Sequence, residues 1–245
     1  MKDNFSTQAM HYAKCRPEYP QDLFEFIISN IDAKHIAWDC ATGNGQAATK
    51  LAAYFEKVEA TDISQSQLDH AIAIDNIRYS TQPAEKTDFP ENYFDLITVA
   101  QALHWFNFDE FYAEAKRVIK PQGWIAVWTY ALFRISPEID NVIDEYHFNT
   151  MKEYWDPERA YVDNHYSDIP FPVVEIPCPR FEMTYTWAIQ DLENYLKTWS
   201  SYTKYMSVNM ESPLPQLLQH LDPLWGEEKM TVRFPVYLRM GEIHK

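Results

Sequence analysis

The sequence predicts an α/β fold in which helices cover both faces of a doubly wound, mostly parallel sheet. Strand-like apolar runs alternate with helix-like segments from Tyr19 to Leu132, and this alternation is typical of right-handed crossovers between parallel strands. A turn with two glycines separates the first of these strands from the helix after it. Two more strand-like runs near the C-terminus bring the expected sheet to seven strands with an antiparallel edge strand.

Residues 21–132 supply five of the expected strands. The first helix is expected at residues 21–31, where apolar side chains recur at helical spacing. The strands are expected at residues 36–41, 58–62, 77–81, 94–100 and 124–130, with helices at about 45–55, 64–75 and 108–119 between them. Pro121-Gln122-Gly123 predicts a turn that ends the last of these helices and begins the fifth strand.

The texture of the sequence changes after Leu132. Residues 134–180 contain six prolines and many aromatic side chains, but apolar residues recur throughout them. We therefore expect a folded insertion, packed over the edge of the sheet, rather than a disordered linker. A strand at 181–187, helices near 190–204 and 213–224 and a final strand at 230–240 are expected to follow. The two late strands would form the antiparallel edge.

The composition excludes several classes of partner. A net charge of −15 argues against nucleic acid or a membrane as the main partner, because phosphate binding needs a positive face. The three cysteines are odd in number and lack CxxC spacing, so we expect a reducing compartment and no metal site. The N-terminus lacks the apolar core of a secretory signal, and the sequence predicts a cytoplasmic protein.

The first chemical signal is the turn that runs from Asp39 to Gly45. It contains two of only five glycines, and it lies between a predicted strand and a predicted helix. Glycine allows left-handed backbone angles and lets a ligand lie directly on the backbone. Asp62 ends the next strand, where a carboxylate can accept hydrogen bonds from both ribose hydroxyls of an adenosine. Together these residues predict a site for a nucleotide-type cofactor.

The spacing of the turn disfavours two common nucleotide sites. Ala48 stands where the third glycine of a G-x-G-x-x-G dinucleotide motif would be. The GK[ST] sequence that binds nucleoside triphosphates is also missing. A pyrophosphate-binding site is therefore disfavoured.

Further segments extend this pattern into a resemblance. The motif Asp39-Cys-Ala41-Thr-Gly43-Asn-Gly45 is followed by Asp62-Ile63-Ser64, Pro83-Ala84-Glu85, Phe94-Asp95-Leu96-Ile97 and Arg117-Val-Ile-Lys-Pro-Gln-Gly123. In this order they resemble the class I S-adenosylmethionine-dependent methyltransferases of the type 11 group, which have a Rossmann-like sheet. The stretches 12–20 and 102–106 resemble the trans-aconitate methyltransferase-like enzymes within that group. The resemblance covers about residues 10–132.

The resemblance implies S-adenosyl-L-methionine as cofactor. The backbone at Ala41, Thr42 and Gly43 would face the methionine part, with the Asp39 carboxylate near its amino group or a water molecule, and Gly45 is also an implied cofactor residue. The other implied cofactor residues are Asp62 at the ribose, Ile63 beside the adenine, Ala84 and Glu85 at the adenine edge, and Ala100 and Gln101 at the sulfonium. Ala41 replaces the first glycine of the family motif. Because a methyl group disfavours positive φ, we expect Ala41 to be strand-like and the sharp turn to lie at Gly43 and Gly45.

Methyl transfer from a sulfonium needs mainly in-line positioning of the acceptor and exclusion of water. Aromatic faces near the positive sulfur would help, and the aromatic candidates for this wall are Tyr12, Trp105 and Tyr130. Trp199 belongs to a cluster of aromatic residues at helical spacing, which predicts either core packing or a pocket roof.

Two ionisable residues have alternative interpretations. His104 follows the fourth strand and is placed to act as a general base or to orient a substrate oxygen, or simply to pack in the pocket floor. Arg16 is either a bidentate clamp for a carboxylate or a surface residue before Pro17.

The sequence therefore predicts a methyltransferase that acts on a small molecule, with O-methylation of a carboxylate favoured by the resemblance and by Arg16. The alternatives are an NAD(P)-dependent oxidoreductase on a similar sheet and a non-catalytic S-adenosylmethionine-binding protein. One domain is expected, as a monomer or homodimer. Its parts would be an N-terminal cap segment 1–20, a cofactor-binding half 21–132, an insertion or cap 133–180 and a C-terminal sheet edge with helices 181–245.

Overall fold

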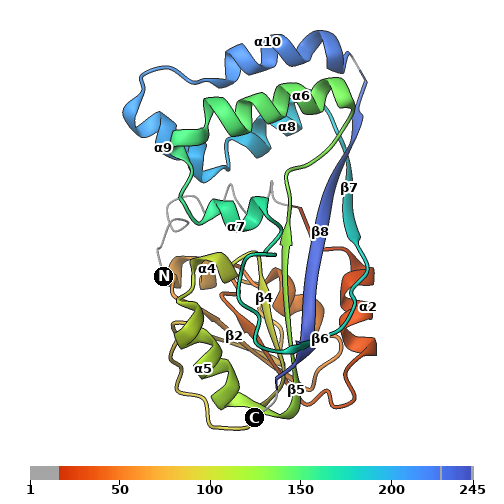
Figure 1. The fold of residues 1–245 in the computed structure, drawn as a ribbon, viewed down its shortest axis with the longest axis vertical. Coiled ribbons are helices and arrows are strands. Elements are labelled where there is room, and N and C mark those ends of the chain that lie inside the picture. The colour runs from red at the N-terminus through yellow and green to blue at the C-terminus, as the bar shows by residue number, and fades with distance from the viewer. Residues whose placement is uncertain (1–16, 227, 244–245) are drawn as a thin grey trace.

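The computed structural model describes residues 17–226 and 228–243 of the chain. Figure 1 shows a sheet flanked by helices in its lower part and a layer of helices in its upper part. The long strand β8 (Met230–Glu242) runs from one part to the other. No helix among these residues is long and apolar enough to cross a membrane.

Five parallel strands form the first part of the sheet, in the order β3-β2-β1-β4-β5. They are β1 (Ile36–Cys40), β2 (Lys57–Asp62), β3 (Ile77–Thr81), β4 (Phe94–Ala100) and β5 (Ile119–Tyr130). The strand order reverses between β1 and β4, and ligands of open α/β sheets bind at the carboxyl ends of the strands at such a point. The predicted doubly wound fold is confirmed.

The second part of the sheet is antiparallel. β8 pairs with β5 along one side, and with β7 (Phe181–Trp187) and the two-residue β6 (Val174–Glu175) along the other. The predicted antiparallel edge is therefore present, and β6 is an eighth strand that two residues are too few to predict. β5 also begins earlier than expected, because the turn at residues 121–123 forms a bulge within the strand, with Gln122 at φ +65°.

Helices cover the two faces of the parallel strands. α2 (Gln21–Ser29) and α3 (Gln46–Leu51) bury their apolar side chains in one core cluster, and α5 (Phe108–Val118) buries its own in a second. α4 (Gln65–Leu68) is much shorter than the helix expected at 64–75. The apolar run after it does not face the core, since Ile72 is 63% exposed, so no packing extends the helix.

A layer of helices lies beyond the carboxyl ends of the parallel strands. It contains α6 (Pro137–Glu145), α8 (Ile189–Leu196), α9 (Ser200–Val208) and α10 (Leu214–Trp225), with α7 (Arg159–Asp163) between it and the sheet (Figure 1). The insertion was expected over the edge of the sheet. β6 pairs with β8 there and His165 stacks on Tyr237 of β8, but α6 belongs to the helical layer. The helix expected near 190–204 is two helices, because Trp199 has an extended backbone.

Short irregular helices connect these elements. They are the 3₁₀ turns Leu103–Trp105 and Lys152–Tyr154 and the π-helix Tyr146–Thr150.

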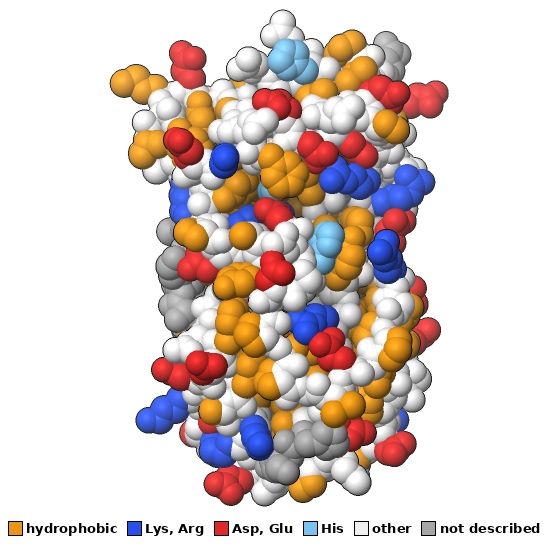
Figure 2. All heavy atoms as spheres, in the orientation of Figure 1, with side chains coloured by type: hydrophobic (Ala, Val, Ile, Leu, Met, Phe, Trp, Pro, Cys, Tyr) orange, Lys and Arg blue, Asp and Glu red, His pale blue; other side chains and the backbone are white. Residues whose placement is uncertain are grey.

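On the face drawn in Figure 2, acidic and basic side chains are interspersed rather than gathered into patches of one sign.

Candidate active site

A cavity of about 180 Å³ lies where the carboxyl ends of four parallel strands meet the helical layer. On the strand side it is lined by Ala41, Thr42, Gly43, Asn44, Gln46, Ala47, Asp62, Ile63, Ser64, Gln67, Ala100, Gln101, Ala102, His104, Trp105 and Tyr130. The other lining residues are Pro17, Tyr19, Trp155, Asp156, Arg159, Val162, Tyr195, Trp199 and Ser200. The cavity thus joins the two halves of the chain.

The turn after β1 is left-handed at three positions. Ala41 has φ +55°, Gly43 has φ +57° and Gly45 has φ +86°. The expectation that Ala41 would be strand-like is wrong: the turn needs a left-handed residue there as well, and alanine adopts this conformation at a cost of about 1–2 kcal/mol. Gly45 has a further constraint, because a Cβ there would overlap the hydroxyl of Tyr79.

Asp39 supports this turn from below. Its carboxylate accepts hydrogen bonds from the hydroxyls of Thr42, at 2.5 Å, and Thr98, at 2.9 Å. Asp39 is fully buried, and burial raises its pKa to about 6 although both hydrogen bonds act in the opposite direction. The side chain is not among those that line the cavity. Its position therefore fits a role in shaping the turn.

Asp62 connects the end of β2 to the same turn. One carboxylate oxygen accepts the N–H of Gly43 at 2.9 Å, and the other accepts the N–H of Ser64 at 2.8 Å. A carboxylate oxygen can accept more than one hydrogen bond. Asp62 lines the cavity, so it can hold the turn and accept hydrogen bonds from a ligand at the same time.

Gln101 fixes the end of β4 against β5. Its backbone is left-handed at φ +56°, and its N–H donates to the carbonyl of Trp128 at 2.8 Å. Its side-chain oxygen accepts the hydroxyl of Thr129 at 2.9 Å and the N–H of Tyr130 at 2.7 Å. These bonds hold Gln101 and Tyr130 together at the wall of the cavity.

His104 lies in the 3₁₀ turn after β4 and is only 6% exposed. Burial lowers its pKa to about 3, and the positive charge of Arg159 acts in the same direction. Its Nδ1 lies 2.8 Å from the hydroxyl of Tyr166. At neutral pH the imidazole is therefore uncharged.

Arg159 brings a positive charge to the cavity, and the sequence reasoning missed it. It is the one Lys or Arg among the described residues that line the cavity. Its Nε donates to the carboxylate of Asp163 at 2.9 Å, and its guanidinium lies 4.7 Å from the ring centre of Trp155. The four-residue spacing of Arg159 and Asp163, typical of a helical ion pair, was the one local signal.

Comparison with known proteins identifies the family. Residues 38–127 match the family described as methyltransferase domain. The chain is 36% identical over 249 residues to a Dictyostelium discoideum protein named as a methyltransferase, with 98% of this chain and 95% of that protein covered.

The chain belongs to the S-adenosylmethionine-dependent methyltransferases.

Other relatives agree with this assignment. A solved structure from Anaeromyxobacter dehalogenans, described as a type II methyltransferase, is 36% identical with a TM-score of 0.86, and the match covers 94% of this chain and 98% of that one. A Saccharomyces cerevisiae protein named as an S-adenosylmethionine-dependent methyltransferase is 23% identical, with 86% of this chain and 84% of that protein covered. The oxidoreductase alternative is thereby set aside, and the cofactor of the enzyme is S-adenosylmethionine.

Most of the site residues that the sequence predicts line one cavity. Ala41, Thr42, Gly43, Asp62, Ile63, Ala100, Gln101, His104, Trp105, Tyr130 and Trp199 all line it. Gly43 suits a ligand that lies on the backbone, because, apart from its two chain neighbours, no atom of the described residues lies within 4 Å of the place where its Cβ would be. The residues present therefore fit the cofactor that the family uses.

Other predicted residues of the methyltransferase lie elsewhere. Gly45 is adjacent to the lining residues but is not one of them. The cavity stops short of Ala84 and Glu85, and Glu85 accepts a hydrogen bond from the N–H of Asn107 at 3.2 Å. Their place at the adenine edge stays a prediction. Tyr12 and Arg16 lie outside the described residues.

Proposed function

We propose that this enzyme transfers the methyl group of S-adenosylmethionine to an oxygen of a small carboxylic acid. The observation that supports this most directly is the guanidinium of Arg159 at the cavity. Among the described residues, its two terminal nitrogens make no hydrogen bond, so they can bind a ligand. A guanidinium matches a carboxylate in charge and in geometry, because it donates two parallel hydrogen bonds.

The ionisable groups around the cavity favour an acceptor that is already ionised. His104, with a pKa of about 3, is a weak base at neutral pH. Asp156 forms an ion pair with Lys204 at 2.6 Å. A phenol or an ammonium group must lose a proton before it can accept a methyl group, whereas a carboxylic acid has lost its proton at neutral pH. A carboxylate therefore fits this set of residues better than the other acceptor classes.

The charges balance in the proposed reaction. The carboxylate oxygen forms a bond to the methyl carbon as the bond between that carbon and sulfur breaks. The negative charge of the acceptor and the positive charge of the sulfonium cancel, giving an ester and a neutral thioether. No proton has to move, and the protein has only to align the reactants and exclude water.

The walls of the cavity are suited to aligning the reactants and excluding water. Aromatic side chains from both halves of the chain line it: Tyr19, Trp105, Tyr130, Trp155, Tyr195 and Trp199. Their faces favour a cation such as a sulfonium and exclude water from the reacting atoms.

On the cofactor side, we propose that the backbone of residues 41–45 binds the methionine part and that Asp62 accepts hydrogen bonds from the ribose. Ile63 would flank the adenine, and Ala100 and Gln101 would lie beside the sulfonium. The open backbone at Gly43 and the carboxylate of Asp62, both at the cavity, support these roles.

The test is methyl transfer from labelled S-adenosylmethionine to a panel of small carboxylic acids, phenols and amines. We expect the label to appear in methyl esters of the carboxylic acids, from which alkaline hydrolysis releases it as methanol. Label in phenols or amines alone would overturn the carboxylate proposal. A mixture of the same acids without enzyme controls for chemical methylation.

A further inference from the structure

His104 and Tyr166 form a buried pair at the edge of the cavity. Nδ1 of His104 lies 2.8 Å from the hydroxyl of Tyr166, and the exposed fractions of the two side chains are 6% and 1%. His104 lines the cavity, whereas Tyr166 lies behind it. Tyr166 is therefore placed to act on a ligand only through the imidazole.

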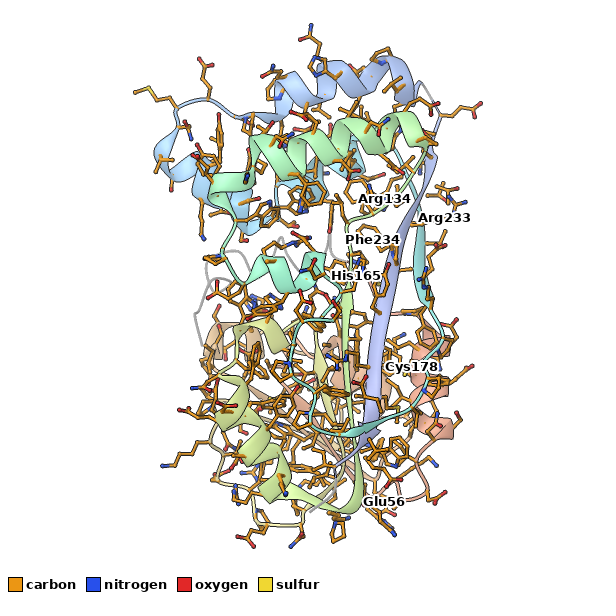
Figure 3. The ribbon with its side chains drawn as sticks, in the orientation of Figure 1. Glu56, Arg134, His165, Cys178, Arg233 and Phe234 are labelled. Atoms are coloured by element: carbon orange, nitrogen blue, oxygen red, sulfur yellow. The ribbon has the colours of Figure 1, made fainter. Side chains whose placement is uncertain are left out.

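The backbone that carries Tyr166 is held in an unfavourable conformation. His165 and Tyr166 both have left-handed backbones, with φ +56° and +61°, which is rare for bulky residues and is concentrated at functional sites. His165 stacks on Tyr237 of β8, with ring centres 3.8 Å apart, and it lies between α7 and β8 in Figure 3. Packing against the sheet thus helps to hold Tyr166 in this position.

Arg239 provides a second restraint on the same segment. Its guanidinium donates to the carbonyl oxygens of Tyr166, at 2.8 Å, and Ile169, at 2.7 Å. Its other edge binds both carboxylate oxygens of Glu175, at 2.6 and 3.2 Å. A strained segment that β8 holds at two points therefore delivers one hydroxyl group to the imidazole.

The surroundings decide which partner of the pair donates the proton. The backbone N–H groups of Leu103 and His104 face the phenol oxygen as donors. The hydroxyl of Thr129 faces it as well, but Thr129 gives its own hydrogen to Gln101 at 2.9 Å. Within the described part of the chain, the hydrogen bond that the Tyr166 hydroxyl makes is with Nδ1 of His104, at 2.8 Å, and the neutral imidazole can accept there. A buried hydroxyl left without an acceptor is costly.

Burial, together with the positive charge of Arg159, keeps His104 neutral. Burial lowers its pKa, Arg159 lowers it further and Asp163 acts in the opposite direction. Burial also raises the pKa of the Tyr166 phenol. Each partner therefore holds one proton at neutral pH, and the arrangement of donors and acceptors determines where the imidazole proton lies.

We propose that Tyr166 is a positioning residue that donates to Nδ1 of His104 and thereby fixes the imidazole as the Nε2–H tautomer. Nε2 has no partner among the described residues, and it is not one of the nitrogens sealed away from solvent. Because His104 lines the cavity, Nε2–H is a hydrogen-bond donor toward the ligand. His104 then orients an acceptor oxygen and does not remove a proton.

The role of Nε2–H in methyl transfer rests on the proposed carboxylate acceptor. The assignment of the tautomer does not depend on that acceptor. The attacking oxygen loses negative charge as the new bond forms, so a donor bound to it would stabilise the ground state more than the transition state. Nε2–H would help most by binding the other carboxylate oxygen and fixing the angle of attack.

The test is NMR of the protein with isotope-labelled histidine, without any acceptor, in which the two ring nitrogens report the tautomer. His104 is assigned by the signal that disappears in His104→Gln. We expect the Nε2–H tautomer in the wild type from about pH 6 to 8 and its loss in Tyr166→Phe. Tyr112→Phe is the matched control, because Tyr112 is another buried tyrosine, its hydroxyl has no hydrogen-bond partner among the described residues, and it lies outside the cavity.

An Nδ1–H tautomer in the wild type, or an unchanged Nε2–H tautomer in Tyr166→Phe, would overturn the proposal. The wild-type measurement stands by itself even if the variant does not fold. In kinetics, Tyr166→Phe should raise the acceptor KM or lower kcat about tenfold, with the cofactor KM unchanged. If the tautomer is as expected but no carboxylic acid is methylated, the proposed function fails and the role of Tyr166 stands.

Discussion

At the scale of single residues, the cavity is lined on its two sides by side chains of opposite charge, Asp62 and Arg159. The carboxylate of Asp62 lies on the strand side, where it is held by two backbone N–H groups, and the guanidinium of Arg159 lies on the helix side, where Asp163 holds its Nε. A cationic cofactor and an anionic acceptor would each meet a complementary charge there. Each charge can be removed separately, which makes the two halves of the proposal independently testable.

Arg159→Met should weaken acceptor binding and spare the cofactor. Losing a pair of charge-assisted hydrogen bonds is expected to raise the KM for a carboxylic acid by roughly 10- to 100-fold. Steady-state kinetics with each substrate varied in turn measures this. Arg134→Met is the matched control, since Arg134 forms an ion pair with Asp144 away from the cavity. An unchanged acceptor KM in Arg159→Met would remove Arg159 from the binding role.

Asp62→Ala should have the reverse effect. It removes the proposed ribose acceptor and a support of the turn, so the affinity for S-adenosylhomocysteine should fall by about tenfold or more. Isothermal titration calorimetry measures the change, with Asp75→Ala as the control at an exposed carboxylate after α4. Equal affinities in wild type and Asp62→Ala would contradict the assignment.

At the element scale, the turn between β1 and α3 has an alanine at one left-handed position and a glycine at another, and the surroundings of the two differ. Ala41 occupies a left-handed position although it is not glycine. Gly45 has less freedom, because a side chain there would have to displace the hydroxyl end of Tyr79 and adopt a left-handed backbone at φ +86°. The two positions should therefore respond to substitution in opposite ways.

Ala41→Gly should stabilise the protein. Glycine relieves the left-handed strain of alanine, and we expect the free energy of unfolding to rise by about 1 kcal/mol. Chemical denaturation with the slope held constant measures this. The same substitution at Ala115, in the middle of α5, should lower the free energy of unfolding by about 1 kcal/mol or more. A less stable Ala41→Gly variant would show that the turn does not strain alanine.

The elements themselves differ in how far the sequence predicts them. β1 and β4 were predictable because each is a short apolar run next to a turn, and both are buried on two faces. The break between α8 and α9 was not, because nothing local marks Trp199 as extended and its buried position depends on packing with Tyr146 and Trp155. Local pattern decides an element only where tertiary packing does not override it.

At the scale of the whole molecule, the first half of the chain forms the strand side of the cavity, where we propose that the cofactor binds, and the second half contributes most of the opposite side, where we propose that the acceptor binds. The turn and Asp62 belong to short motifs that follow consecutive strands, which is why sequence reasoning found them. Arg159, Tyr195 and Ser200 come from separate segments of the second half and meet only when the helical layer folds over the strands. Their proximity is a property of the tertiary fold, so no local pattern predicts it.

The same cavity region contains two buried groups whose pKa shifts affect stability in opposite ways. Asp39 has its pKa raised from 3.8 to about 6, so the folded protein binds an extra proton between these values and loses stability as pH rises through them. His104 has its pKa lowered from 6.5 to about 3, so the unfolded chain binds the extra proton and stability is lost as pH falls below about 6.5. Between about pH 4 and 6 the two effects oppose each other.

Replacing one of the two groups should therefore leave a pH dependence of the free energy of unfolding that comes from the other. In His104→Gln the histidine contribution is gone, so the variant should gain stability relative to wild type as pH falls from about 7 to 4, by roughly 2–3 kcal/mol. In Asp39→Asn the aspartate contribution is gone, so the variant should gain stability relative to wild type as pH rises from about 4 to 6, by a similar amount. Urea denaturation of the three proteins at several pH values measures both differences. Differences that stay constant across this range would mean that neither group changes its proton affinity on folding, which would contradict the burial of both beside the cavity.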